Sequence, residues 1–399
     1  MAQGPSGGGR GGLSRRGLLK AGGGAAFAGV SLAALNLPFF STDGVVQDPA
    51  KCRADDLSAT QKRLIVSNWP QYIDEADDGS PTTLTNFEKR TGITVTYNDD
   101  VNDNAEFYAK VRNQLGGCEP IKRDMMVLTD WMAARMIGLG WVQPMDPKKV
   151  PNVEKNLIDP LRARQWDPDQ TYHAPWQTGL TGIAYNSAKT KEVKSFEELL
   201  TRPDLKGRVT LLSEMRDTMA FMMKVIGADP DDFTDAEWST AIERLEKVVK
   251  SGQIRAFTGN EYTQDLAAGN ILACEAWSGD VIQLQFDNPD IKFVTPEEGL
   301  SLWSDNMLIP NLAAHQSNAE EWVNYYYEPE VAAQLAAWVN YICPVKGAKE
   351  EMEKIDPSLV DNKLIFPDDK MLETTFDFMP LDDKQTTEFE GDWANVTGG

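Results

Sequence analysis

From residue 63 onward, short apolar segments alternate with segments whose apolar residues recur at helical spacing. Residues 63–69 (RLIVSNW) predict a buried strand, and residues 82–92 (TTLTNFEKRTG) predict a helix that ends at a glycine. The same pair is repeated twice more, over residues 93–100, 104–117, 124–130 and 131–140. A repeated strand–helix–strand pattern predicts a parallel sheet with helices on both faces, which is an α/β fold.

The alternation stops once and then resumes. Residues 172–186 (YHAPWQTGLTGIAYN) are predicted to be extended, as expected where a chain crosses between two lobes. A second series of strands and helices follows, ending in a helical segment over residues 317–339 that Pro329 interrupts. The chain after the first forty residues has about 355 residues. This length is too great for a single hydrophobic core and suits two lobes.

The first forty residues have the character of a targeting segment. Arg15 and Arg16 precede an apolar stretch rich in Gly and Ala, and no acid occurs before Asp43. This pattern predicts that residues 1–40 are a twin-arginine export signal. The alternative is an uncleaved membrane anchor, which would leave the same domain outside the membrane. No later segment is apolar enough to span a bilayer.

The formal net charge of −22 bears on possible partners. Such a surface repels nucleic acid and anionic lipid, and it attracts cations, so we expect no nucleic-acid partner. The alternative is that the acidic residues only keep the protein soluble.

The cysteines are Cys52, Cys118, Cys274 and Cys343, and their spacing matches no zinc or CxxC pattern. An oxidising exterior permits disulfides. The sequence leaves three pairings open. Of these we favour Cys274–Cys343, because each of the two lies near a candidate aromatic residue of the site described next.

Aromatic and acidic residues gather at the ends of five predicted strands. In open parallel sheets, ligands bind outside the carboxyl ends of the strands, so residues at these positions are candidates for a binding site. The candidates are Trp69, Asp130, Trp131, Glu214, Asp217, Trp277, Asp280, Trp303 and Asp305.

This pairing of rings and acids suits a ligand with several amines. An aromatic face attracts a cation, and a carboxylate forms a charge-assisted hydrogen bond with an ammonium group. Alternating the two along a cleft predicts a polyamine ligand. Each residue also has a structural interpretation: the tryptophans as core residues, Asp217 and Asp280 as helix N-caps, and Tyr341 as packing between lobes.

Motifs of the common enzyme classes are missing from the sequence. The two histidines, His173 and His315, lie near no GxSxG and form no metal cluster, and there is no P-loop or GxGxxG after a strand. We therefore expect no catalytic residue, no metal and no cofactor. A glycosidase that uses Glu214 and Asp217 as its acid pair is the hydrolase alternative.

Several segments together carry a resemblance to a known family. They are SNWPQYI (67–73), NFEKRTGITVTY (86–97), DNAEFYAK (103–110), FEELLTRPDLKGRVTLLSEMRD (196–217), GNILACEAWSGD (269–280) and SLWSDNMLIP (301–310). In this order they resemble the periplasmic spermidine/putrescine-binding proteins, the substrate-capture subunits of ABC polyamine importers. The resemblance extends from about residue 63 to about residue 370.

The resemblance implies a two-lobed α/β fold of the type II periplasmic-binding-protein class, with mixed, mostly parallel sheets flanked by helices. One lobe would comprise residues 60–178 and 306–342, and the other residues 179–305 and 343–399. The ligand would lie in the cleft between them, which closes by a hinge motion.

The resemblance also implies roles for single residues. Trp69 and Tyr72 would enclose the ligand from the first loop, and Tyr341 would complete the wall. Trp131, or Asp130 beside it, would take a position where the family often has Tyr or Ser. The remaining candidates would hold the amines: Glu214, Asp217, Trp277, Asp280, Trp303 and Asp305. The implied protein is an extracytoplasmic monomer that delivers a polyamine to membrane permease subunits.

Three alternatives stay open beside this interpretation. The same fold binds other cationic or small polar solutes, and receptors for thiamine or ferric ion also use it. A ferric site needs paired tyrosines, and residues 324–329 (NYYYEP) contain three in succession. The third alternative is the hydrolase.

Overall fold

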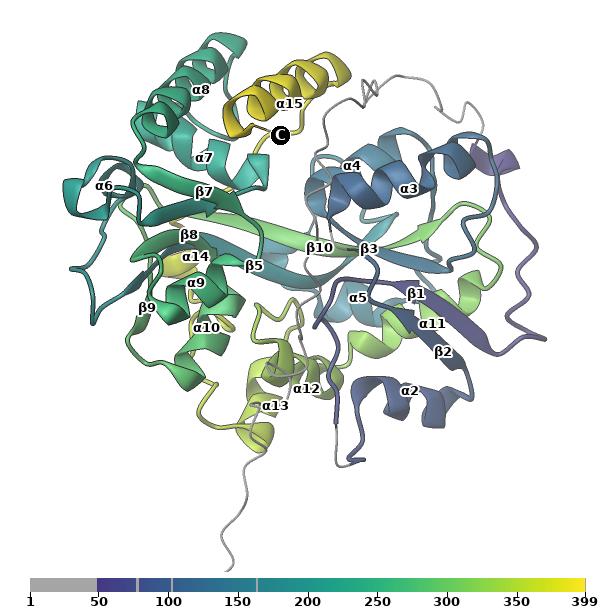
Figure 1. Cartoon of the computed structure of the whole chain (residues 1–399). Coiled ribbons are helices and arrows are strands. Elements are labelled where there is room, and N and C mark those ends of the chain that lie inside the picture. Colours follow the sequence, from purple (N-terminus) through teal and green to yellow (C-terminus); the bar gives the residue numbers. More distant parts are fainter. Residues whose placement is uncertain (1–48, 77–78, 102, 163, 399) are drawn as a thin grey trace, which may run out of the picture. The chain divides into compact units, whose positions relative to one another are not determined.

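The strands join in one mixed sheet in a computed structural model, which describes residues 49–398 apart from 77, 78, 102 and 163 (Figure 1). The predicted export signal lies outside the described residues. The order of the main strands is β2-β1-β3-β10-β5-β8-β6-β7. They are β1 (Arg63–Ser67), β2 (Thr94–Asn98), β3 (Met125–Thr129), β5 (His173–Asn186), β6 (Val209–Leu212), β7 (Ile254–Thr258), β8 (Ala273–Trp277) and β10 (Leu300–Pro310).

At one end of this order, β1 pairs in parallel with both β2 and β3. The helices that follow these strands are α2 (Thr83–Thr91), α3 (Asn104–Gly116) and α4 (Asp130–Gly138). Local sequence explains their limits. Thr82 caps α2 through a capping box, and Gly92 ends it at φ 71°, a left-handed conformation that favours glycine. The predicted strand–helix alternation is confirmed here.

At the other end, β6 pairs in parallel with β7 and β8. The helices of this group are α7 (Met215–Ile226), α8 (Asp235–Lys250), α9 (Tyr262–Ala268) and α10 (Ser278–Asp287). The sequence pattern did not predict β7, because only Ile254 of its five residues is buried.

Two long strands join the parallel groups. β5 and β10 lie side by side and antiparallel; β10 is also antiparallel to β3, and β5 is antiparallel to β8 (Figure 1). The sheet is therefore mixed, and the extended prediction for residues 172–186 is confirmed by β5. One expectation is wrong: Trp303 and Asp305 lie within β10 rather than beyond a strand end. Because alternate residues of a strand share a face, this placement still puts both side chains on one side of the sheet.

The remaining elements are short strands that also join this sheet and helices that flank it. Strands β4 (Val142–Gln143) and β11 (Thr375–Phe376) pair with β10, and β9 (Ile291–Val294) pairs with β5. The other α-helices are α5 (Pro151–Asn156), α6 (Phe196–Thr201), α11 (Gln316–Tyr326), α12 (Pro329–Val339), α13 (Ala348–Ile355), α14 (Asp369–Leu372) and α15 (Asp383–Thr397). Pro329 begins α12, which explains the predicted break. Over the described ranges, no helix combines the length and the apolar character needed to cross a membrane.

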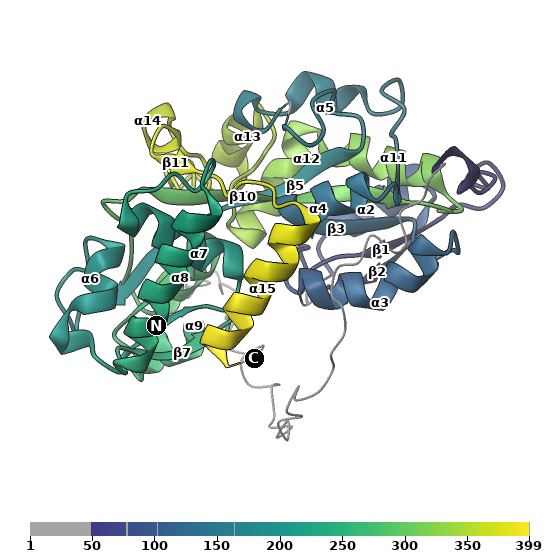
Figure 2. The same cartoon turned by 90° about the horizontal axis from the view of Figure 1, so that it is seen from above.

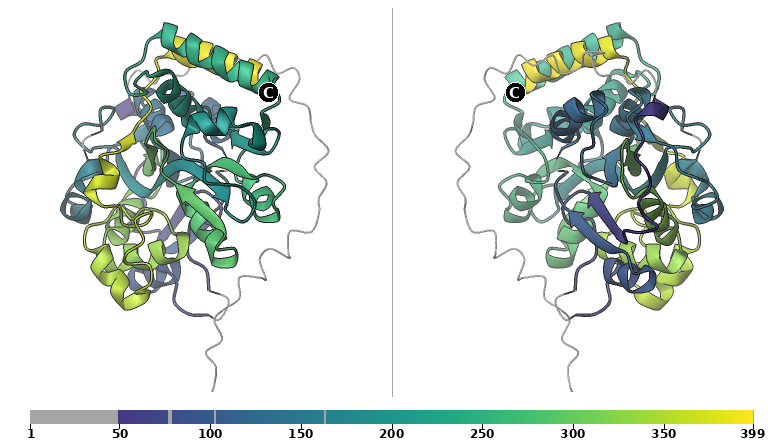
Figure 3. Two further views of the ribbon diagram at one scale, coloured as in Figure 1. Left: turned by 90° about the vertical axis from the view of Figure 1, so that its left-hand side faces the viewer. Right: turned by 90° about the vertical axis from the view of Figure 1, so that its right-hand side faces the viewer.

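The C-terminal helix α15 lies along α8 (Figures 2 and 3). The rings of Trp238 and Phe389 stack with centroids 4.0 Å apart, and the Trp238 Nε1–H donates to Asp392 at 3.0 Å. The sequence pattern did not predict this helix. The contacts with α8 show why it folds: its apolar residues complete the core of the second strand group.

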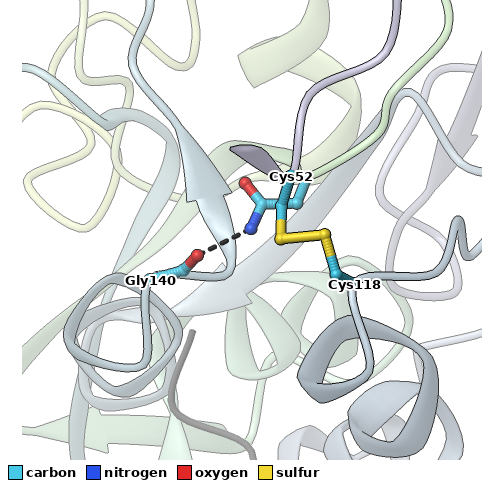
Figure 4. Close-up of a disulfide and its surroundings, with 4 residues drawn as sticks. Cys52, Cys118 and Gly140 are labelled. Atoms are coloured by element: carbon cyan, nitrogen blue, oxygen red, sulfur yellow. Dashed lines mark hydrogen bonds between the residues drawn. A yellow bond between two sulfur atoms is a disulfide. The ribbon is translucent and has the colours of Figure 1, made fainter. Parts of the chain in front are cut away.

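The favoured disulfide pairing is wrong. Cys52 is bonded to Cys118, with Cα atoms 5.4 Å apart, and this bond ties the segment before β1 to the end of α3 (Figure 4). Cys274 and Cys343 are free and buried. They pack in different hydrophobic clusters, Cys274 within β8 and Cys343 in the core around α11 and α12, so their chain positions near site residues do not bring them together.

Candidate ligand site

Three carboxylates form the centre of the candidate site, which we call the acid set: Asp217 and Asp305, which are buried, and Asp280, which is half-buried. Each accepts hydrogen bonds from neutral side chains, and among the described residues none of the three has a Lys or Arg as an ion-pair partner. Burial raises the pKa of all three. Buried acids without a base are costly to ionise, so this arrangement favours a ligand that brings positive charge.

Asp305 is positioned by the pairing of β10 with β3. Thr129 lies opposite it in the register, and the Thr129 hydroxyl donates to Asp305 Oδ1 at 2.7 Å. The Tyr72 hydroxyl donates to Asp305 Oδ2 at 2.8 Å. Asp305 is 4% exposed, and burial raises its pKa to about 7. Tyr72 and Asp305 were both predicted site residues, and the structure places them in direct contact.

Asp280 lies in the first turn of α10, within reach of three donors. The hydroxyls of Tyr262 and Tyr341 donate to it at 2.8 and 3.1 Å, and the Asn260 amide donates at 2.9 Å. Burial is the largest cause of its raised pKa. The N-cap of α10 is Trp277, so the interpretation of Asp280 as a helix cap is wrong.

Asp217 is connected to two tryptophans. It accepts from Trp277 Nε1 at 3.0 Å and from the Thr181 hydroxyl at 2.7 Å. Thr181 in turn accepts from Trp303 Nε1 at 3.0 Å. Burial raises the pKa of Asp217 to about 6. It is not a helix cap either, because Glu214 holds the N-cap position of α7.

Tyr341 connects these parts through ring contacts. Its ring centroid lies 5.6 Å from that of Tyr72 and 5.7 Å from that of Trp303. The backbone of the next residue, Ile342, pairs with Thr178 of β5, which fixes the position of the ring. Seven predicted site residues are thereby brought together: Tyr72, Asp217, Trp277, Asp280, Trp303, Asp305 and Tyr341.

Two glycines make room for these rings. A Cβ on Gly179, the register partner of Trp303, would lie 2.2 Å from the Trp303 ring. A Cβ on Gly279 would lie 2.4 Å from the ring of Tyr341. Only glycine lets the rings take these positions without a shift.

Asp130 has a different environment from the acid set. It accepts from the Ser304 backbone N–H at 3.0 Å and from the Asn306 amide at 2.8 Å, and it forms an ion pair with Arg164 at 3.3 Å. Its carboxylate is therefore engaged within the protein, where it holds α4 to β10. Asp130 therefore does not belong to the acid set.

Trp131 and Glu214 lie beside a cation that the chain itself supplies. The guanidinium carbon of Arg216 lies 3.5 Å from the ring centroid of Trp131. Glu214 Oε1 accepts from the Arg216 backbone N–H at 3.4 Å and lies 3.9 Å from its guanidinium, and burial raises the pKa of Glu214 to about 8. Trp69, the last predicted residue, packs half-buried against two hydrophobic clusters.

Sequence reasoning missed several residues of the site. Thr129, Thr181, Asn260 and Tyr262 donate to the acid set, and Arg216 covers Trp131. Thr129 immediately precedes Asp130 at the end of β3, so the strand-end rule that selected Asp130 also pointed to it. Tyr262 carried no comparable signal, because it reaches Asp280 from a separate helix.

The ferric-ion alternative is not supported by the tyrosines that suggested it. The hydroxyls of Tyr325, Tyr326 and Tyr327 donate to backbone carbonyls, those of Thr83, Trp176 and Pro175 respectively. All three tyrosines are buried in the core. The described residues contain no group of three or more His, Cys, Asp or Glu side chains suited to a metal ion.

Comparison with known proteins identifies the family. Residues 82–365 match the bacterial extracellular solute-binding protein family. The chain belongs to this family. It is therefore an extracytoplasmic solute-binding protein and not an enzyme, as the sequence predicted.

Relatives within the family include two proteins of Escherichia coli strain K12. The spermidine/putrescine-binding periplasmic protein is 26% identical over 307 residues, which is 76% of this chain and 83% of that protein. The putrescine-binding periplasmic protein PotF is 28% identical over 368 residues, covering 86% and 93%.

A solved structure confirms the predicted fold class. The spermidine/putrescine ABC transporter substrate-binding protein PotD from Streptococcus pneumoniae superimposes with a TM-score of 0.71 at 23% identity, covering 85% of this chain and 99% of that chain. The fold of this solute-binding protein is accordingly α/β, of the type II periplasmic-binding-protein class.

Proposed function

We propose that this protein captures a polyamine, with spermidine and putrescine as the first candidates, and delivers it to the membrane permease subunits of an ABC importer. The observation that carries the proposal is the acid set: three buried or half-buried carboxylates that neighbouring Tyr, Trp and Thr side chains hold in place without a base. Relatives whose names specify spermidine or putrescine support the same ligand class.

The chemistry of the site matches a chain of amines. Each ammonium group that meets a carboxylate gains a charge-assisted hydrogen bond, which contributes about 1.5–3 kcal/mol. The indoles of Trp277 and Trp303 offer apolar faces for the methylene segments between amines, and cation–π attraction adds about 0.5–2 kcal/mol. A neutral sugar would leave the acids without a counter-charge, so we expect it to bind poorly.

The sequence predicted one lobe at residues 60–178 and 306–342, and the other at residues 179–305 and 343–399. One boundary needs correction: Cys343, Val345 and Ile365 pack in the core around α11 and α12, so we place residues 343–365 with the first lobe. The register of β10 against β5 shifts between Asp305 and Asn306, at the proposed crossing. Asp305 would then lie where the chain passes between lobes, so a ligand that binds it also holds the lobes together.

Titration calorimetry tests the proposal. Spermidine, spermine and putrescine are titrated into the full chain beside a panel of neutral sugars and a basic amino acid. We expect a polyamine to bind at micromolar Kd or tighter, about −8 kcal/mol. Heat from a sugar or the amino acid, with none from any polyamine, would refute the proposal.

Two further properties belong to the same proposal. Arg15 and Arg16 in the first forty residues support export by the twin-arginine route. We also propose that the protein acts as a monomer, because one chain supplies the whole acid set.

A further inference from the structure

We propose that Arg216 is a positioning residue that latches the two strand groups together around the bound solute. Its guanidinium covers the face of Trp131, so this ring serves as the receptor of the latch rather than as a ligand contact. The inference builds on the proposed function, because the latch acts on the affinity for the solute.

The contact joins distant parts of the sheet. Trp131 lies in α4, directly after β3, and Arg216 lies in α7, directly after β6. In the sheet, β10, β5 and β8 separate β3 from β6. The guanidinium carbon nevertheless lies 3.5 Å from the centroid of the Trp131 ring, and the Arg216 side chain is only 10% exposed.

The acids around Arg216 hold it only loosely. Glu214 Oε1 and Glu390 Oε1 lie 3.9 and 3.8 Å from its guanidinium nitrogens, beyond the length of a direct hydrogen bond. Glu390 is supplied by α15, which the Trp238–Phe389 stack holds on α8. A guanidinium held by a ring face and two distant acids can be released without breaking a tight ion pair, which suits a contact that opens briefly to let a solute pass and then forms again.

Chain connectivity links the latch to the solute. Asp217 of the acid set is the residue after Arg216 in the same helix. When a ligand amine binds Asp217, α7 is held in place, and Arg216 is held over Trp131. The latch should therefore slow release of the solute more than it affects capture.

Release kinetics test the latch with variants of one residue. Stopped-flow measurements with spermidine and putrescine compare the native chain with Arg216→Gln and Arg216→Lys. We expect Arg216→Gln to raise the off-rate about tenfold, with the on-rate within twofold. Arg216→Lys keeps the charge but loses the planar group, and it should raise the off-rate about threefold.

The matched control is Arg244→Gln in α8. Arg244 forms an ion pair with the surface residue Glu197. This change should leave both rates unchanged. An unchanged off-rate in Arg216→Gln would overturn the proposal. So would a gain in affinity for spermidine relative to putrescine, because it would show that Arg216 occupies a position for a ligand amine.

A double-mutant cycle tests the partner. If Arg216 acts through the ring, then Trp131→Leu with Arg216→Gln should raise the off-rate no more than either change alone. If the double variant raises the off-rate by the product of the two single effects, the proposed pairing of Arg216 with Trp131 is overturned.

A distance measurement separates failure of the latch from failure of the proposed function. Spin labels on Lys89→Cys in α2 and Glu243→Cys in α8 report on the two strand groups, because the native cysteines are either bonded or buried. If no polyamine binds the native chain, the proposed function fails, and the latch is then tested on the empty protein. In the empty protein, Arg216→Gln should broaden the distribution of distances between the two spin labels toward longer values. An unchanged distribution would overturn the latch.

Discussion

The acid set and the Arg216 cluster (Trp131, Glu214, Arg216 and Glu390) use the same residue types with opposite outcomes. Both place carboxylates beside tryptophan rings. In the cluster the chain supplies its own cation, which covers the ring of Trp131. In the acid set no base of the described chain pairs with Asp217, Asp280 or Asp305, and neutral donors hold each acid in place.

The difference shows how to distinguish a binding residue from an internal contact. Rings and acids near each other are not sufficient, because Asp130 and Glu214 also meet that description and are engaged within the chain. Buried acids that lack a base are destabilising unless something compensates them. A ligand that supplies the missing charge is one such compensation.

The largest expected effect comes from removing two charges of the acid set together. Asp217→Asn with Asp305→Asn should weaken polyamine binding by about 3–6 kcal/mol, because two charge-assisted contacts are lost. Asparagine keeps an acceptor for Thr181 and Tyr72, so the fold should be retained. Calorimetry measures the affinity, and either single change should cost about 1.5–3 kcal/mol. Full affinity in the double variant would show that these acids only support structure.

Asp130→Asn provides the contrast, because its effect should fall on stability. The change leaves Arg164 without one of its two acids and weakens the bonds from Ser304 and Asn306. We expect the free energy of unfolding to drop by about 1–3 kcal/mol. Denaturant unfolding of the empty protein measures it. A variant of native stability with much weaker binding would place Asp130 in the acid set after all.

Gly179→Ala should disturb the site by a purely steric route. The added Cβ would lie 2.2 Å from the Trp303 ring, so the ring or the strand must shift. We expect a stability cost of about 1–3 kcal/mol and weaker binding. Gly138→Ala in α4 is the matched control, since nothing lies within 4 Å of its Cβ position, and it should be neutral or slightly stabilising. Equal behaviour of the two variants would contradict the proposed fit.

The smallest effect concerns pH. Burial raises the pKa of Asp305 to about 7 and that of Asp217 to about 6, and a cation binds their ionised forms. Affinity should therefore be about tenfold weaker at pH 6 than at pH 7.5, with protons released on binding. Calorimetry in buffers of different ionisation enthalpy detects this release. A flat pH profile would mean that the acids are already ionised in the empty protein.

Stability of the empty protein should respond in the opposite direction. Near neutral pH the folded state holds more protons on these acids than the unfolded state does. Their contribution to the free energy of unfolding therefore falls as the pH rises through about 6 and 7. Thermal melts of the empty and the polyamine-loaded protein should diverge with rising pH, because only the loaded form has the counter-charge.

Much of the fold followed from local pattern. The alternation of apolar runs and amphipathic segments predicted β1 to β3 and α2 to α4, because the periodicity of a strand or a helix depends only on residues close together in the sequence. Pro329 and Gly92 predicted their breaks for the same reason. The strand β7 and the tail helix α15 were not predicted. Each is stabilised by packing against elements far away in the chain, which periodicity does not record.

The sequence by itself determined the residue types of the site, the α/β class and the acidic surface, because composition and local spacing carry these directly. Only the tertiary structure decided which acids have a base. Arg164 reaches Asp130 from 34 residues away, whereas Arg216 lies next to Asp217 in the chain and yet covers Trp131. It also decided that Cys52 pairs with Cys118. The physical reason is shared: counter-charges and sulfur atoms meet through space, and their separation depends on how β5 and β10 bring the two strand groups together.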